Sequence, residues 1–209
     1  MEIIKTIYKT LLESYGPQFW WPAETEFEVM VGAVLTQNTS WNNAEKAIIS
    51  LKSENALNLA SISRMTEARL SILIQSSGFH RVKAKTLKSL VSLIYKEFDS
   101  CIGKFKKLPA DEKRNLLLSI KGIGPETADD IMLYVLDEPR FIVDEYTRRI
   151  FRRVGKTPIS NTYEIGRDTS ELQSLVNLVC RLLLEKKKNK PHPPPPQNPP
   201  ISQPNAYPP

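Results

Sequence analysis

The sequence predicts an all-α protein. Apolar residues recur at intervals of three and four positions in most segments, which is the spacing of one buried helix face. No segment shows the sustained alternation of apolar and polar residues that a half-buried strand would show. Because the helical segments follow one another closely, we expect them to be joined by short loops.

The first part of the chain holds three predicted helices. Residues 1–15 have helical spacing, and a Gly-Pro pair ends that helix. Residues 27–37, "FEVMVGAVLTQ", are almost wholly apolar and predict a buried helix, although their valines also allow a strand. Residues 41–53 are amphipathic, and Ser40 or Asn42 is placed to cap that helix.

The helical pattern continues through the middle of the chain. Residues 66–76 and 81–98 show the same period, and the second segment has a lysine-rich face. Leu116–Ile120 and Ala128–Leu136 flank a pair of glycines, and Asp144–Val154 predicts a short basic helix.

The end of the chain is different in composition. Ten of the sixteen prolines lie in the last nineteen residues, where they oppose helix formation and favour an extended, solvated chain. We therefore expect residues 187–209 to be a disordered Pro-rich tail. A polyproline ligand for a partner domain is the functional alternative.

Charge and cysteine content limit the function classes. The net charge of +6 suits an anionic partner, although a lysine-rich surface is also a common solvated surface. No run approaches the roughly 18 apolar residues of a membrane span, and the N-terminus lacks the apolar core of a secretory signal. We expect a cytoplasmic protein with no membrane partner. With Cys101 and Cys180 as its only cysteines, the chain has neither a disulfide framework nor a four-thiolate cluster.

A hairpin between two helices is predicted by "SIKGIGPETADDI" (119–131). Gly122 and Gly124 supply backbone conformations that a side chain would forbid, and Pro125 suits the first position of the next helix. The free N–H groups at that helix start, with the positive end of the helix dipole, form an anion site. A plain tight turn would also explain the glycines, but not Ile123, which we expect to anchor the hairpin tip in the core.

These motifs together resemble the helix–hairpin–helix superfamily of DNA glycosylases, which includes endonuclease III and the adenine and alkyl-base glycosylases. The family pattern is a hairpin, an apolar helix, a short loop and an aspartate that opens the next helix. Here it reads "IKGIG", then "TADDIMLYVLDEPRF", then "IVDEYTRRIFRRVG". The segments "VLTQNTSWNNAEKAI" and "SGFHRVKAKTL" are also similar to family segments, so the resemblance covers roughly residues 19–165.

The resemblance implies a two-lobe glycosylase fold with a six-helix, barrel-like domain. Residues 27–140 would form the helical barrel with hairpin 120–124, whereas residues 1–26 and 141–186 would form the terminal lobe. After "ELQSL" the chain departs from the family pattern, which indicates an altered or shortened C-terminal part of that lobe.

The resemblance also assigns chemical roles. Asp144 would be the catalytic carboxylate that stabilises positive charge on the sugar or orients the attacking water. It would equally suit an N-cap, and Glu145 is a weaker catalytic alternative. Glu126 stands where bifunctional members carry a lysine that attacks the sugar, so we expect a hydrolase without efficient lyase activity.

Contacts with DNA follow from the same resemblance. Gln37 would enter the duplex and fill the gap left by an extruded base, or simply cap the preceding helix. The residues expected at DNA phosphates are Lys121, Gly122, Gly124, Glu126 through its backbone, Thr127, Lys83 and Lys85. Lys88 and Lys96 are expected on a charged helix face, and at least two arginines of residues 148–153 on an ion-paired one.

The three tryptophans flank the first apolar helix of residues 27–37. Aromatic walls suit a flipped base, and they suit a cationic alkylated purine better. The expected base pocket is therefore lined by Trp20, Trp21, Pro22 and Trp41. As the alternative, at least one of Trp20 and Trp21 belongs to the core. The combination closely resembles the 3-methyladenine glycosylase branch that lacks the iron–sulfur cluster.

The expected function is base excision repair by a monofunctional DNA glycosylase. It would act as a monomer, in the bacterial cytoplasm or nucleoid, on double-stranded DNA that carries an alkylated purine such as 3-methyladenine. No iron–sulfur cluster or catalytic metal is expected, although the hairpin leaves room for a structural monovalent cation. Two alternatives stay open: an endonuclease III-like glycosylase and AP lyase on oxidised pyrimidines, and a non-catalytic duplex-binding protein.

Overall fold

The structure is a computed structural model of the 209-residue chain. It describes residues 21–138, 140 and 142–153, with residues 6, 9–10 and 13–14 near the N-terminus. Over the continuous part it gives, in chain order, α2 (Glu26–Leu35), α3 (Trp41–Ser53), α4 (Leu59–Arg64), α5 (Glu67–Leu73), the 3-10 helix η1 (Gln75–Ser77), α6 (His80–Phe98), α7 (Ile102–Lys106), α8 (Ala110–Leu118), α9 (Pro125–Tyr134) and α10 (Glu145–Arg153). The described residues contain no strand, and the predicted all-α class is confirmed.

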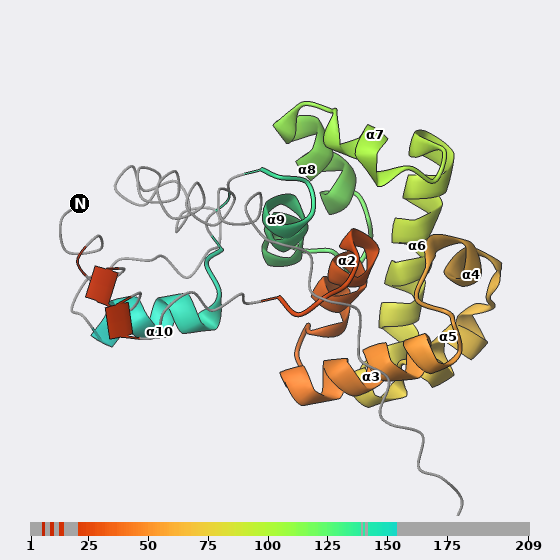
Figure 1. Cartoon of the computed structure of the whole chain (residues 1–209), viewed down its shortest axis with the longest axis horizontal. Helices are drawn as coiled ribbons and strands as arrows, with labels where there is room; N and C mark the ends of the chain where they lie inside the picture. Colours follow the sequence, from red (N-terminus) through yellow and green to blue (C-terminus); the bar gives the residue numbers. More distant parts are fainter. Residues whose placement is uncertain are drawn as a thin grey trace, which may run out of the picture.

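Helix α2 forms the centre of the helical body. It begins after Thr25, whose hydroxyl accepts a hydrogen bond from the N–H of Glu28 at 3.1 Å. Every residue from Phe27 to Leu35 is buried, and Figure 1 shows α9, α6 and α3 arranged around this helix. A helix enclosed on all sides is apolar on all sides, which explains why residues 27–37 lack an amphipathic pattern. The strand alternative for this segment is wrong.

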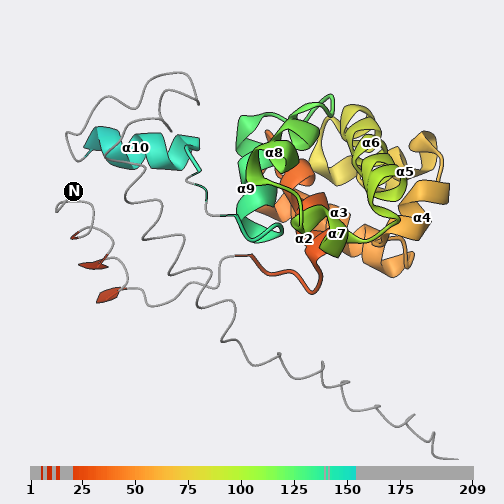
Figure 2. The same ribbon diagram turned by 90° about the horizontal axis from the view of Figure 1, so that it is seen from above.

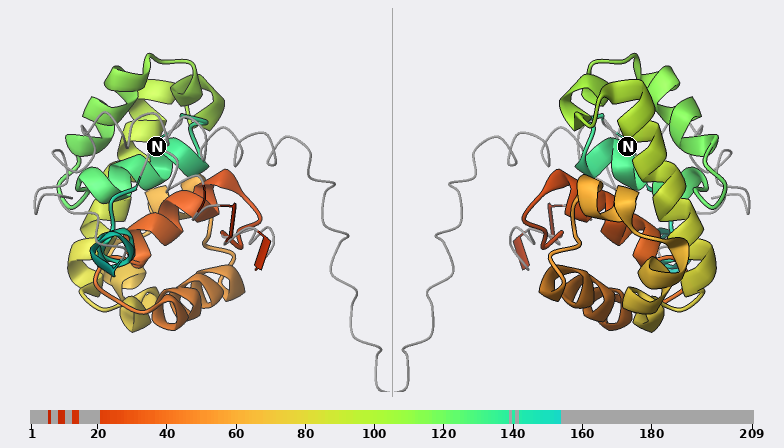
Figure 3. Two further views of the ribbon diagram at one scale, coloured as in Figure 1. Left: turned by 90° about the vertical axis from the view of Figure 1, so that its left-hand side faces the viewer. Right: turned by 90° about the vertical axis from the view of Figure 1, so that its right-hand side faces the viewer.

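Helix α6 runs along one face of the body, as the right-hand view of Figure 3 shows. Leu87, Leu90 and Ile94 are fully buried on one stripe of this helix, which packs against α4 and α5. The sequence predicts Lys88 on a charged face, but its ammonium donates three hydrogen bonds of 2.6 to 3.0 Å to carbonyls at the end of α4, those of Ile62, Ser63 and Met65. The lysine thus caps the C-terminus of α4, where a positive charge is favourable.

Several boundaries differ from the sequence prediction. The helix expected over 66–76 ends at Leu73 and continues as the 3-10 helix η1. The short helices α4 and α7 are not predicted, because five or six residues are too few to display a helical period. Ser40 is the N-cap of α3, without a side-chain cap hydrogen bond. The helix expected over 1–15 and the tail 187–209 fall mostly or wholly outside the described residues.

Helix α10 lies to one side of the helical body, next to α9, in both Figure 1 and Figure 2. The start of α10 faces the body, and Asp144 directly precedes this helix in the sequence. The boundaries predicted for the terminal lobe, 1–26 and 141–186, fall largely beyond the described ranges and stay predictions. Among the helices described, none combines the length and the apolar character that crossing a bilayer would require.

Candidate active site

The predicted hairpin connects α8 to α9, and Gly122 is its tightest point. This glycine has a φ of +98°, and a Cβ built on it would lie 2.2 Å from Thr86 Oγ1 of α6. The Thr86 hydroxyl donates a hydrogen bond of 3.0 Å to the carbonyl of Lys121. Ile123 is only 5% exposed and belongs to the main core. Its predicted anchoring role is confirmed, and the hairpin is held by α6 as well as by the core.

Gly124 differs from the sequence prediction. Its φ of −92° is available to any residue, so the expectation of a conformation forbidden to other side chains is correct for Gly122 and wrong for Gly124. A Cβ on Gly124 would meet no atom within 4 Å. The second glycine instead leaves open space in front of the first turn of α9, where Pro125 occupies the predicted first position. Lys121, Gly122 and Gly124 are all exposed.

The side chain of Gln37 contacts this hairpin directly. Its amide nitrogen donates hydrogen bonds to the Gly122 carbonyl and to Thr127 Oγ1, each at 2.9 Å. Gln37 therefore does not cap α2; the C-cap is Thr36. Thr127 is buried and its hydroxyl accepts from Gln37, so the phosphate contact predicted for Thr127 would have to come from its backbone.

The two lysines predicted at phosphates have different environments. The ammonium of Lys83 is buried and donates to the carbonyls of Leu35, at 2.9 Å, and Ser77, at 2.7 Å. Its predicted phosphate contact is wrong, because the side chain ties the loop before α6 to the end of α2. Burial lowers the pKa of Lys83 to about 8. Lys85, two residues later, is exposed as a phosphate-binding residue would be.

Three carboxylates gather at the start of α9 and the start of α10. Glu126 and Asp130 lie one turn apart on α9, and half-buried Asp144 immediately precedes α10. Burial raises the pKa of Asp130 to about 8, and neighbouring charges act in the same direction, those of Glu126, Asp144 and Asp129. Desolvation and then the charge of Asp144 raise the pKa of Glu126, whereas Arg148 opposes the shift. Asp144 thus lies within electrostatic reach of the helix that the hairpin opens.

The described tryptophans pack together beside α2. The rings of Trp21 and Trp41 meet edge to face with centroids 6.1 Å apart, and Tyr134 of α9 lies 5.1 Å from Trp21. A Cβ on Gly32 would come within 3.2 Å of the Trp21 ring, so this ring rests on α2 at the one position without a side chain. Trp21 packs against the main core, which agrees with the alternative that at least one of Trp20 and Trp21 belongs to the core. Trp20 lies outside the described residues.

A pocket of about 140 Å³ opens beside these rings. Trp21, Pro22 and Trp41, three of the four residues predicted for the base pocket, contribute to its wall. The rest of the wall comes from α2 and from later residues of α3 and includes Glu28 and Lys52, whose charged groups pair at 2.9 Å. The structure therefore brings the aromatic residues together around a small pocket with a charged rim.

Phe79 is an exposed aromatic residue that the sequence patterns did not single out. Its side chain is 69% exposed and its φ is +45°, a conformation that bulky residues rarely adopt. Phe79 directly precedes α6. Lys83 holds this loop against the end of α2 through the carbonyls of Ser77 and Leu35, so Phe79 lies near the end of α2, which Gln37 follows in the sequence. The signal in the sequence is a large apolar residue directly after a glycine in a polar loop.

The remaining predictions concern arginines and metals. Arg152 pairs with Glu145 at 3.6 Å on the surface of α10, as expected for some arginines of this helix. Within the described ranges, no three His, Cys, Asp or Glu side chains are grouped so that they could hold a metal ion.

The hairpin, the following helix and the aspartate before α10 all lie within the longer segment that a family model matches. Residues 31–172 match the HhH-GPD superfamily of base excision DNA repair proteins. The chain belongs to this superfamily. The resemblance inferred from the motifs and the enzyme class, a DNA glycosylase, are thereby confirmed.

Individual HhH-GPD relatives agree with this assignment. A Methanocaldococcus jannaschii protein provisionally named a DNA repair glycosylase is 48% identical over 159 residues, which are 74% of this chain and 70% of the relative. The crystal structure of the Helicobacter pylori 3-methyladenine DNA glycosylase bound to 1,N6-ethenoadenine is 31% identical, with a TM-score of 0.69 over 88% of this chain and 83% of that one. A covalent endonuclease III–DNA complex, at 18% identity and a TM-score of 0.66 over 79% of this chain and 74% of that one, shares the fold.

Proposed function

We propose that this HhH-GPD protein is a monofunctional glycosylase that releases alkylated purines, such as 3-methyladenine, from double-stranded DNA. The observation that carries the proposal is a carboxylate, Glu126, in the first turn of α9, together with Asp144 directly before α10; burial and then the charge of Asp144 raise the pKa of Glu126. Glu126 occupies the first turn of α9, where a lysine would be needed to attack the sugar and form an imine. A carboxylate cannot form that imine, so water is the nucleophile.

The chemistry follows from the position of Asp144. As the bond between sugar and base breaks, the base takes the electron pair and the sugar becomes positively charged. The Asp144 carboxylate stabilises that charge. Water then adds to the sugar carbon and gives its proton to a carboxylate. An N-alkylated purine that is already cationic departs as a neutral molecule, so the enzyme does not have to protonate it.

Duplex DNA binds across the hairpin side of the body in this proposal. Exposed amides at the start of α9 and the open space at Gly124 accept a phosphate, and the exposed ammonium groups of Lys121 and Lys85 contact its neighbours. Phe79, exposed on the same side of the body, stacks against bases. Gln37 enters the duplex only if its amide leaves Gly122 and Thr127.

The flipped base enters the pocket beside Trp21 and Trp41. Aromatic rings attract a cationic purine through their faces, and the similarity to the Helicobacter pylori structure, a 3-methyladenine glycosylase with a bound ethenoadenine, supports an alkylated purine as the ligand. Trp21 rests on Gly32 and meets Trp41 edge to face, so both rings line the pocket that receives the base in this proposal. We further propose that the enzyme is a monomer without a metal cofactor and works where the DNA is, in the bacterial cytoplasm or nucleoid.

An endonuclease III-like lyase is the second candidate, and it is favoured by relatives with that name, such as the Thermotoga maritima protein at 26% identity over 129 residues. The two candidates are separated by borohydride trapping on duplexes that contain either methylated purines or oxidised pyrimidines. We expect methylated purines to be released with no trapped protein–DNA adduct. Trapping on oxidised pyrimidines would instead establish the lyase, and duplex binding without release of any base would establish a non-catalytic binding protein.

A further inference from the structure

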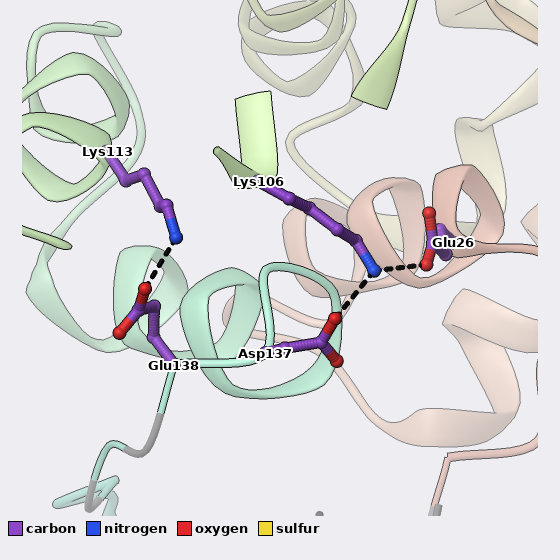
Figure 4. Close-up of polar contacts among 5 residues, drawn as sticks. All are labelled: Glu26, Lys106, Lys113, Asp137 and Glu138. Carbon is purple, nitrogen blue, oxygen red and sulfur yellow. Dashed lines mark hydrogen bonds and ion pairs between the residues drawn. The ribbon is translucent and has the colours of Figure 1, made fainter. Parts of the chain in front are cut away.

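The chain that leads from α9 to Asp144 is held by two buried or partly buried lysines. Lys113 of α8 pairs with Glu138 at 2.5 Å, and the Lys113 side chain is only 3% exposed. Lys106 of α7 bridges Asp137, at 2.8 Å, and Glu26 of α2, at 2.5 Å. Figure 4 shows the two ammonium groups reaching the first residues of this connection from different helices.

The backbone leaves α9 in a defined direction at the same point. Asp137 has a φ of +57°, and the N–H of Glu138 donates to the Met132 carbonyl at 2.9 Å, so the chain reverses here. A positive φ is uncommon outside glycine, although aspartate adopts it more readily than most residues, and the contact with Lys106 holds the Asp137 side chain at this turn. Val143 is fully buried and immediately precedes Asp144. The connection is therefore fixed at its start by charge pairs and at its end by an apolar anchor.

We propose that Lys113 and Lys106 are positioning residues for Asp144. A catalytic carboxylate contributes only when it lies within a fraction of an ångström of the productive geometry. Asp144 belongs to no helix of the body, and the described residues that lead to it, Asp137, Glu138 and Val143, contribute to its position. Lys113, buried against Glu138, controls that position most strongly, and Lys106 adds a link to α2, on which Trp21 rests. This inference rests on the proposed catalytic role of Asp144.

The experiment compares single-turnover release of methylated purine from duplex DNA by the full-length chain and its variants. We expect Lys113→Met to lower the rate constant about 10-fold or more, while the affinity for undamaged duplex stays within about twofold, because the hairpin contacts are unchanged. Lys106→Met should lower the rate less, and Lys113→Arg should recover most of it. Lys104→Met is the matched control, since Lys104 lies on the same helix as Lys106 but pairs with exposed Asp99.

The double variant Lys113→Met/Glu138→Leu separates a loss of positioning from a loss of stability. It leaves no buried charge without a partner, so we expect it to unfold close to the wild-type temperature and yet to release base as slowly as Lys113→Met. Wild-type rates in this double variant would overturn the inference. If the wild type itself releases no base, the proposed function fails separately. Hydrogen exchange of the amides in residues 137–144 then decides. Faster exchange in the double variant than in wild type supports the inference that Lys113 holds this connection, and equal exchange overturns it.

Discussion

The side-chain amide of Gln37 donates a hydrogen bond to Thr127 Oγ1 at 2.9 Å, although 90 residues separate the two in sequence. The same nitrogen donates to the Gly122 carbonyl, so the loop after α2 and the hairpin form one unit in the free protein. A residue proposed to enter the duplex is thus also part of the resting structure.

Replacing Gln37 should therefore affect stability even without DNA. Gln37→Glu places an oxygen where a donor faces the Gly122 carbonyl, and we expect it to lower the free energy of unfolding by about 1–3 kcal/mol. Urea denaturation of the free protein measures the change, with Gln75→Glu, an exposed position in η1, as the control. Equal stability of the Gln37 variant and wild type would show that the contact with the hairpin is not formed in solution.

The two hairpin glycines should respond differently to the same substitution. Gly122→Ala combines a positive φ with a Cβ 2.2 Å from Thr86 Oγ1, and we expect a loss of about 2 kcal/mol or more in the free energy of unfolding. Gly124→Ala has neither problem and should keep wild-type stability. It should weaken duplex binding, because the added methyl group stands where the phosphate approaches. Thermal unfolding and a duplex-binding titration check both variants; a stable Gly122→Ala would contradict the structure of the hairpin.

A lysine pair in one segment provides the third contrast. Lys83→Met leaves the carbonyls of Leu35 and Ser77 without their donor, and we expect it to cost about 1–3 kcal/mol of stability. Lys85→Met should be stable but should bind duplex more weakly, with a smaller dependence of affinity on salt. The opposite pattern, a stable Lys83 variant with reduced affinity, would restore the phosphate contact that the sequence predicts for Lys83.

Helical phase distinguishes these two lysines from the sequence alone. Lys83 shares a stripe with Leu87, Leu90 and Ile94, all fully buried, whereas Lys85 does not. Lys113 likewise stands four residues before buried Leu117, which indicates a buried lysine with a partner. A lysine on an apolar stripe is therefore better interpreted as a structural donor than as a ligand-binding group.

Other parts of the site are outside the reach of sequence reasoning. The hairpin and its Ile123 anchor are predictable because glycine, proline and apolar spacing act locally. The contacts of Gln37 with Thr127 and of Lys113 with Glu138 depend on how distant helices pack, which local patterns do not determine. The exposed ring of Phe79 escapes prediction because an apolar residue beside a helical segment is usually part of the buried face of that segment.

The raised pKa of Asp130 predicts how stability depends on pH. Burial raises that pKa from 3.8 to about 8, so between about pH 4 and pH 8 the folded protein holds a proton that the unfolded chain has lost. Stability from this group therefore falls as the pH rises through that window. Asp130→Asn cannot lose a proton, so we expect its free energy of unfolding to rise relative to that of wild type by about 3–4 kcal/mol as the pH goes from 5 to 8. Denaturant unfolding of both proteins at pH 5 and pH 8 tests this. If the variant and wild type differed by the same free energy of unfolding at both pH values, the raised pKa of Asp130 would be contradicted.

The most direct measurement is single-turnover release of 3-methyladenine from methylated duplex DNA by wild type, Asp144→Asn and the control Asp111→Asn, whose residue is exposed on α8. Asn keeps the shape of Asp144 but removes its charge, so we expect release to fall by about 10² or more, while duplex affinity and thermal unfolding stay unchanged. Asp111→Asn should release base at the wild-type rate. Equal release by wild type and Asp144→Asn would contradict the central claim that this carboxylate, placed beside the hairpin, carries the chemistry.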